Sequence, residues 1–132
     1  MNNISMPATS STPAVDFDFA SGRLSLSGES WPENAAAFYR PLMAAVEEWQ
    51  GSAFFRNLSL VSIHVALSYF NSSSTKMLFG LFGVLNEAAV NGVRTELHWY
   101  YDSEDDISEE FGQELSIDFS AITFHMHPGG AE

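Results

Sequence analysis

Apolar and polar side chains alternate with a period of two along much of this chain, which is the pattern of β-strands that bury one face and leave the other in water. In the central segment, Val61, Ile63 and Tyr69 fall on one face, and Ser62 and His64 fall on the other. A central strand covered on both sides would be apolar throughout, so we expect helices on one face of the sheet and a more open second face. The predicted strands cover residues 15–19, 23–28, 61–69, 93–101 and about 117–125.

Helical spacing of apolar residues separates these strands. One helix is predicted to end near Gln50, with a kink or restart at Pro41, because proline removes a hydrogen bond and clashes with the preceding turn. A second covers about residues 73–91, and a short third follows the acidic loop after Tyr101. The apolar stripes are Phe38, Leu42, Val46 and Trp49 in the first helix, and Leu78, Leu81, Phe82, Leu85 and Ala88 in the second.

These elements predict a single α/β domain with a mixed five-stranded sheet, an N-terminal hairpin and about three helices mainly on one face. A strand, helix, strand succession implies parallel strands joined by a right-handed crossover. We expect the domain to span residues 13–127, between a disordered lead-in over residues 1–12 and a flexible, glycine-rich tail over residues 128–132.

Composition narrows the possible partners. The chain has 5 Lys and Arg residues against 17 Asp and Glu residues, a formal charge of −12. This charge repels nucleic-acid backbones and anionic lipids, so we expect neither nucleic acid nor membrane as a partner. The absence of cysteine rules out disulfides, thiolate metal sites and a cysteine nucleophile, and is consistent with a reducing cytoplasm. The longest apolar run, residues 77–85, is too short to span a membrane.

Motifs that would carry catalysis do not stand out, and we expect a non-enzyme without a cofactor. Gly80 and Gly83 fall inside a predicted helix rather than in a phosphate-binding loop, and no serine has the Gly-x-Ser-x-Gly setting. His125 and His127 would share one face of the last strand, and His98 could lie on a nearby strand. Three imidazoles can hold zinc. Spacing places no carboxylate beside them. We therefore expect no metal site and keep a His-based metal-binding protein as a less favoured alternative.

Residues 69–76 read Tyr-Phe-Asn-Ser-Ser-Ser-Thr-Lys and join the longest predicted strand to the most apolar predicted helix. The first N–H groups of a helix lack intrahelical partners and carry partial positive charge, so a phosphorylated hydroxyl would fit there. Asn, Ser and Thr are also the ordinary N-cap residues, and the residues alone leave both interpretations open. Met77 and Phe79 fall off the apolar stripe nearby, which fits either a docking surface or burial under a neighbouring loop.

Five short motifs occur in order along the chain. They are Ser-Thr-Pro at 11–13, Gly-Arg-Leu-Ser at 22–25, Pro-Glu-Asn at 32–34, the Asn-to-Lys stretch at 71–76, and Trp-Tyr-Tyr-Asp at 99–102. In these motifs, and over about residues 12–124, the sequence resembles the SiaC family of bacterial regulatory phosphoproteins. The resemblance implies a fold similar to the STAS domains of anti-sigma-factor antagonists.

The resemblance also implies a phosphorylation switch. A Ser/Thr protein kinase with a histidine-kinase-like ATPase fold would phosphorylate a hydroxyl after the loop Asn, and a PP2C-type phosphatase would remove the phosphate. The unmodified form would bind and activate a GGDEF diguanylate cyclase, linking the switch to cyclic-di-GMP and biofilm formation. The family's acceptor, typically Thr in Asn-Thr-Ser-Ser, falls on Ser72 here. Ser73, Ser74 and Thr75 stand beside it as other candidate acceptors.

The expected partner surface surrounds this hydroxyl. Its residues are Asn71, Ser73, Ser74, Thr75, Lys76, Met77, Phe79, Glu33 and Asn34. Glu33 and Asn34 resemble a family motif and equally fit the start of the first helix. A phosphate would add about −1.5 to −2 charges that repel an acidic partner, while helix N–H groups and Lys76 hold the ester. The alternative function is an anti-sigma-factor antagonist that binds an anti-sigma kinase.

Overall fold

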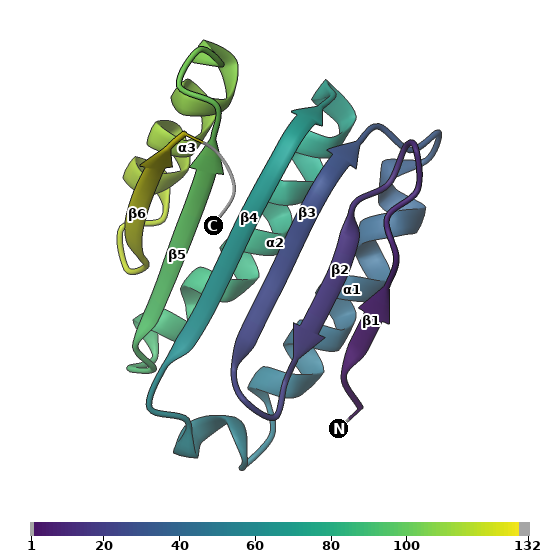
Figure 1. Cartoon of the computed structure of the whole chain (residues 1–132). Coiled ribbons are helices and arrows are strands. Elements are labelled where there is room, and N and C mark those ends of the chain that lie inside the picture. Colours follow the sequence, from purple (N-terminus) through teal and green to yellow (C-terminus); the bar gives the residue numbers. More distant parts are fainter. Residues whose placement is uncertain (1, 130–132) are drawn as a thin grey trace.

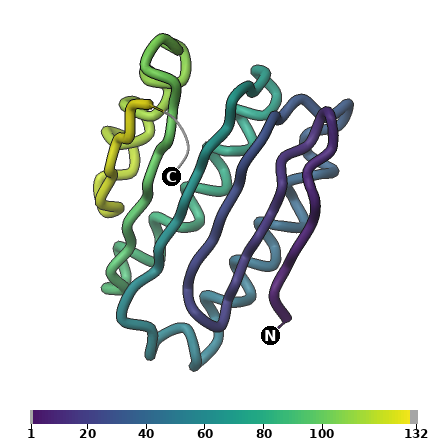
Figure 2. The backbone as a smooth tube through the Cα atoms, viewed as in Figure 1, coloured from purple at the N-terminus to yellow at the C-terminus, as the bar shows by residue number. Residues whose placement is uncertain are grey.

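The computed structural model describes residues 2–129 and shows six strands that lie side by side in the order in which they occur along the chain (Figure 1). The strands are β1 (Ile4–Met6), β2 (Ala14–Asp18), β3 (Arg23–Ser30), β4 (Val61–Phe70), β5 (Thr95–Tyr101) and β6 (Thr123–Pro128). The helices are α1 (Ala35–Gln50), α2 (Ser72–Val90) and α3 (Asp106–Asp118), with a short 3₁₀ helix, η1, at Phe55–Asn57. The first three strands are antiparallel neighbours, and β3 to β6 are parallel. Figure 2 shows β1 at one edge of the sheet and β6 at the other.

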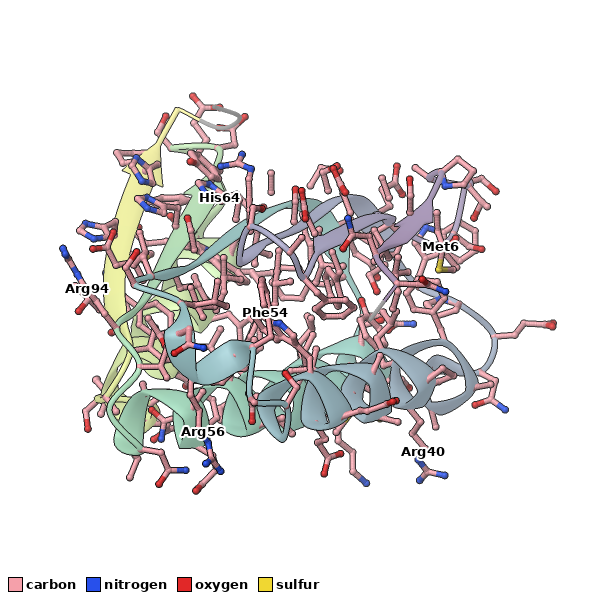
Figure 3. The ribbon with its side chains drawn as sticks, turned by 90° about the horizontal axis from the view of Figure 1, so that it is seen from below. Met6, Arg40, Phe54, Arg56, His64 and Arg94 are labelled. Atoms are coloured by element: carbon pink, nitrogen blue, oxygen red, sulfur yellow. The ribbon has the colours of Figure 1, made fainter. Side chains whose placement is uncertain are left out.

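All three α-helices cover the same face of the sheet, as the one-sided strand pattern predicts. Three successive crossovers advance in one direction across the parallel strands, and because such crossovers are right-handed, their helices fall on one side. Figure 3 views the molecule with the sheet above the helix layer. His64 projects from the open side of the sheet, and Arg40 projects away from the helix layer.

The predicted apolar stripes form the core between the sheet and the helices. The stripe of α2 is buried throughout, at Leu78, Leu81, Phe82, Leu85 and Ala88. In α1, Leu42, Val46 and Trp49 are buried as predicted. Phe38 is only partly buried against the core, and its neighbour Tyr39 is fully buried instead. The helix continues through Pro41 without a restart.

The first strand was not predicted. The pattern predicts five strands and a disordered lead-in over residues 1–12, yet Ile4–Met6 pairs antiparallel with β2. Asn3 anchors this strand, because its Nδ2 donates to Asp18 Oδ1 (3.1 Å) and its Oδ1 accepts from the Phe19 N–H (2.9 Å). Three residues are too few for an alternation to stand out. At the other end, β6 runs to Pro128, and residues 130–132 of the expected tail lie outside the described residues.

The last strand begins later than the pattern predicts. Residues 117–125 were expected to form it, but α3 continues to Asp118 and β6 begins at Thr123. Phe111 and Leu115 form the buried stripe of α3, and Ile117 falls off that stripe and is 76% exposed. An apolar residue outside the stripe of an amphipathic helix therefore resembled the start of a strand.

Tyr69 lies on the opposite side from the one expected. The alternation along β4 assigns it to the buried face, but it is 52% exposed. The register between β3 and β4 shifts between Gly28 and Glu29, so that Gly28 pairs with Leu67 and Glu29 pairs with Tyr69. One residue of β4 is skipped in the pairing, and such an irregularity reverses the faces that follow it.

Candidate functional site

The loops that follow β3, β4 and β5 lie together at one end of the sheet, because the carboxyl ends of parallel strands point the same way. Each loop ends in a residue whose side chain caps the next helix. Asn34, Asn71 and Asp105 accept hydrogen bonds from the backbone N–H three residues later, at 3.0, 2.9 and 3.1 Å. Such caps satisfy N–H groups that the helix itself leaves without partners, and they fix where each helix begins.

The four consecutive hydroxyls at the start of α2 have different surroundings. Ser72 and Ser73, the first two residues of the helix, are exposed. Ser74 is fully buried, with 0% of its surface accessible. Thr75 is half-buried, and its Oγ1 donates to the Ser72 carbonyl at 2.6 Å. Of the four, Ser72 and Ser73 therefore offer the hydroxyls that an enzyme can reach.

Ser74 belongs to a buried hydrogen-bond chain beneath this surface. Tyr39 Oη donates to Ser30 Oγ (2.6 Å), which donates to Ser74 Oγ (2.8 Å), which in turn donates to the Ser30 carbonyl (2.9 Å). The Asn71 N–H donates to the same carbonyl at 3.1 Å. Burial raises the pKa of Tyr39 above its usual 10.0. The chain joins the end of β3 to α1 and to the first turn of α2.

The sequence did contain a signal for the structural role of Ser74. It lies four residues before Leu78, so it extends the buried stripe of α2 by one turn. Ser30 and Tyr39 were not expected to take part, because their contact with Ser74 spans three separate elements.

Two neighbouring pockets lie between the start of α2 and the facing side of α3, and together we call them the α2–α3 groove. Its first part, of about 350 Å³, is lined by Ser68, Tyr69, Phe70, Asn71, Ser72, Asp105 and Ile107. Its second part, of about 560 Å³, is lined by Phe70, Thr75, Lys76, Phe79, Ile107, Glu110, Phe111 and Glu114. Phe70 and Ile107 line both parts, and Ile107 is 72% exposed. The groove thus combines apolar surface, carboxylates and an exposed hydroxyl.

The other residues of the expected partner surface divide between groove and core. Phe79 lines the groove and packs its ring against Phe111 and Phe119, with centroid distances of 5.8 and 5.5 Å. Met77 is half-buried against the core. Glu33 and Asn34 are exposed at the start of α1 and do not line either part of the groove. The structure therefore brings Asn71, Ser72, Thr75, Lys76 and Phe79 together on one surface.

None of the helices within residues 2–129 has the length and apolar character needed to cross a membrane.

Comparisons with known proteins agree on the family. The model of the SiaC family, described as a regulatory phosphoprotein, matches residues 6–129. An uncharacterized protein of Pseudomonas aeruginosa is 33% identical over 129 residues, which cover 95% of this chain and 98% of the relative. The crystal structure of apo-SiaC from the same organism has a TM-score of 0.83 at 30% identity, with 96% of this chain and 99% of that chain covered.

A second similar structure contains a partner. It is the crystal structure of the diguanylate cyclase SiaD in complex with its activator SiaC, again from Pseudomonas aeruginosa. The matched chain has a TM-score of 0.84 at 30% identity, with 95% of this chain and 98% of that chain covered. Because the family model matches residues 6–129, nearly the whole length, this chain belongs to the SiaC family of regulatory phosphoproteins.

Proposed function

We propose that this chain is a non-enzymatic regulator whose unphosphorylated form binds and activates a GGDEF diguanylate cyclase, and that phosphorylation of Ser72 prevents this binding. The observation that carries the proposal is the place of Ser72, exposed at the first position of α2 and lining the α2–α3 groove. The similar SiaC that is solved together with a diguanylate cyclase supports the choice of partner.

Accessibility and position favour Ser72 as the acceptor. Ser74 is buried and bonded to Ser30, and the Thr75 hydroxyl is engaged with a backbone carbonyl. Ser73 is exposed but does not line either part of the groove, whereas Ser72 lines its first part. A kinase of the histidine-kinase-like class would modify Ser72, and a PP2C-type phosphatase would restore it.

Electrostatics explains how the modification would act. The groove already contains the carboxylates of Asp105, Glu110 and Glu114. A phosphate adds about −1.5 to −2 charges at pH 7, which a partner would have to desolvate on binding. The N-terminus of α2 and Lys76, one turn further on, favour the phosphate within the folded chain. The phosphorylated chain therefore stays folded and loses its partner.

The acceptor is tested with Ser72→Ala and the matched control Ser73→Ala, each incubated with the cognate kinase and ATP. Intact-mass spectrometry should show one added phosphate on wild type and on the control, and none on Ser72→Ala. Full incorporation into Ser72→Ala would move the acceptor to another hydroxyl.

The proposed loss of partner binding on phosphorylation is tested by measuring the affinity for the cognate GGDEF cyclase. Ser72→Asp should weaken binding at least about tenfold, because it adds charge where the partner docks, and Ser73→Asp should weaken it less. Equal affinity of Ser72→Asp and wild type would contradict the proposal that negative charge at this position prevents binding. Capture of an anti-sigma kinase from the native host, with no GGDEF protein, would contradict the choice of partner.

A further inference from the structure

The open face of the sheet carries a row of imidazole rings. His64 on β4 pairs in register with His98 on β5, which pairs with His125 on β6. The rings of His64 and His98 stack with centroids 4.7 Å apart, and those of His98 and His125 stack at the same distance. His127 adds a fourth ring, with its centroid 5.0 Å from that of His98. His64 projects from the open side of the sheet, so the rings that pair with it in register lie on the face that the helices do not cover.

A carboxylate lies within this row, although spacing in the sequence placed none there. Glu96 is two residues before His98 on β5, so both side chains fall on one face. Its Oε1 is 3.9 Å from His98 Nε2 and 3.7 Å from His125 Nε2. Its Oε2 accepts a hydrogen bond from Arg94 Nη2 at 2.7 Å. Arg94 thus holds one oxygen and directs the other toward the two imidazoles.

We propose that Glu96, His98 and His125 bind a Zn²⁺ ion on the open face of the sheet. Their three ligand atoms lie within 4.8 Å of one another. In a tetrahedral site with bonds of about 2.0–2.1 Å, ligand atoms are about 3.3 Å apart. The two carboxylate-to-imidazole distances exceed that by about half an ångström, which small side-chain rotations can close. Water would take the fourth position.

The surroundings favour a metal over a simple ion pair. A metal at His98 Nε2 needs the ring proton on Nδ1, and Nδ1 lies 2.8 Å from His127 Nε2, which can accept that proton's hydrogen bond. Such a second hydrogen bond is the usual support of a metal-binding imidazole. Within residues 2–129, His125 Nε2 is a buried nitrogen with no hydrogen-bond partner. Bonding to a metal ion would satisfy it.

The ligand types select the ion. Imidazole nitrogen with one carboxylate suits Zn²⁺, whereas Mg²⁺ and Ca²⁺ take oxygen ligands. The formal charge of −12 also raises the local concentration of cations. Because this site does not involve the α2–α3 groove, it stands apart from the proposed switch.

The test is isothermal titration of the full chain, without a histidine tag, with ZnCl₂ and separately with MgCl₂. We expect one Zn²⁺ per chain and no Mg²⁺ binding. Glu96→Gln and His125→Asn should each weaken Zn²⁺ binding at least about tenfold. The matched control is Asp16→Asn, which removes an exposed carboxylate from the open face of β2, and it should stay within about twofold of wild type.

Imidazole ¹⁵N resonances give an independent readout. Zn²⁺ should shift the Nε2 signals of His98 and His125 and leave the His64 signals in place. Circular dichroism checks that both ligand variants remain folded, as expected for side chains on the solvent side of the sheet. Zn²⁺ affinity that is equal in wild type and both ligand variants, or that falls equally in Asp16→Asn, would overturn the site.

Discussion

Replacing Ser74 by alanine should destabilise the protein and leave the exposed hydroxyls in place. The change removes the bond that Ser74 Oγ donates to the Ser30 carbonyl and the acceptor that Ser30 Oγ uses. The carbonyl keeps the Asn71 N–H as a partner, at 3.1 Å, so the main loss is the buried Ser30 hydroxyl donor.

The magnitude follows from these contacts. A buried donor left without an acceptor costs about 1–3 kcal/mol, and the second bond contributes about 0.5–1.5 kcal/mol. Alanine returns about 0.5 kcal/mol through its higher helix propensity. We therefore expect the free energy of unfolding to fall by about 2 kcal/mol. For a chain of this size, that is a fall in Tm of about 6–10 °C.

Urea and thermal denaturation, followed by circular dichroism, measure this loss. The matched control is Ser73→Ala, which removes an exposed hydroxyl from the same helical turn and should change stability by less than about 0.5 kcal/mol. The urea m-value should stay constant, because the variant exposes the same surface area on unfolding as wild type does. A Ser74→Ala variant as stable as Ser73→Ala would refute the structural role of the buried hydrogen-bond chain.

Three further predictions use the same stability measurements. Asn71→Ala removes the cap of α2 and should cost about 1 kcal/mol, and an unchanged midpoint would show that the cap contributes nothing. Gly112→Ala would place a Cβ 2.7 Å from Cδ1 of the rigid Trp99 ring, so we expect a loss of about 1–3 kcal/mol, and wild-type stability would contradict that crowding. Burial raises the pKa of Tyr39 above 10.0, so the folded state holds the phenol proton more tightly than the unfolded state does. The contribution of Tyr39 to stability is therefore complete below pH 10 and is lost as the pH rises through the pKa of the folded state. Above pH 10, the free energy of unfolding should fall less steeply with pH in Tyr39→Phe than in wild type. An equal slope would exclude Tyr39 as the cause of the fall.

The sequence predicts a sheet covered by helices on one face because each strand and helix has its own hydrophobic period. The buried stripe of α2 and the one-sided pattern of β4 were enough to place helices on one face. The pattern fails where a segment is too short, as at Ile4–Met6, or where pairing is irregular, as at Gly28 and Glu29. Neither a three-residue strand nor a shift in strand pairing produces a repeating pattern in the sequence.

The candidate sites show the same limit. The sequence places Ser72 at a helix start, but all four hydroxyls there look alike until burial separates Ser74 from its neighbours. Alternation assigns His98 to a face of its strand, but the register that sets it beside His125 is a property of pairing between strands. Contacts between elements, unlike periods within them, depend on how the whole chain packs.

Strand order that matches chain order has a consequence for synthesis. Among the strands of residues 2–129, none has to insert between two earlier ones, so each new strand can add to an edge that already exists as the polypeptide leaves the ribosome. The α2–α3 groove is different, because it needs α3, which comes late in the chain. A nascent chain that ends before Asp106 would carry Ser72 but not the second wall of the groove, so only a nearly complete polypeptide can offer that surface to another protein.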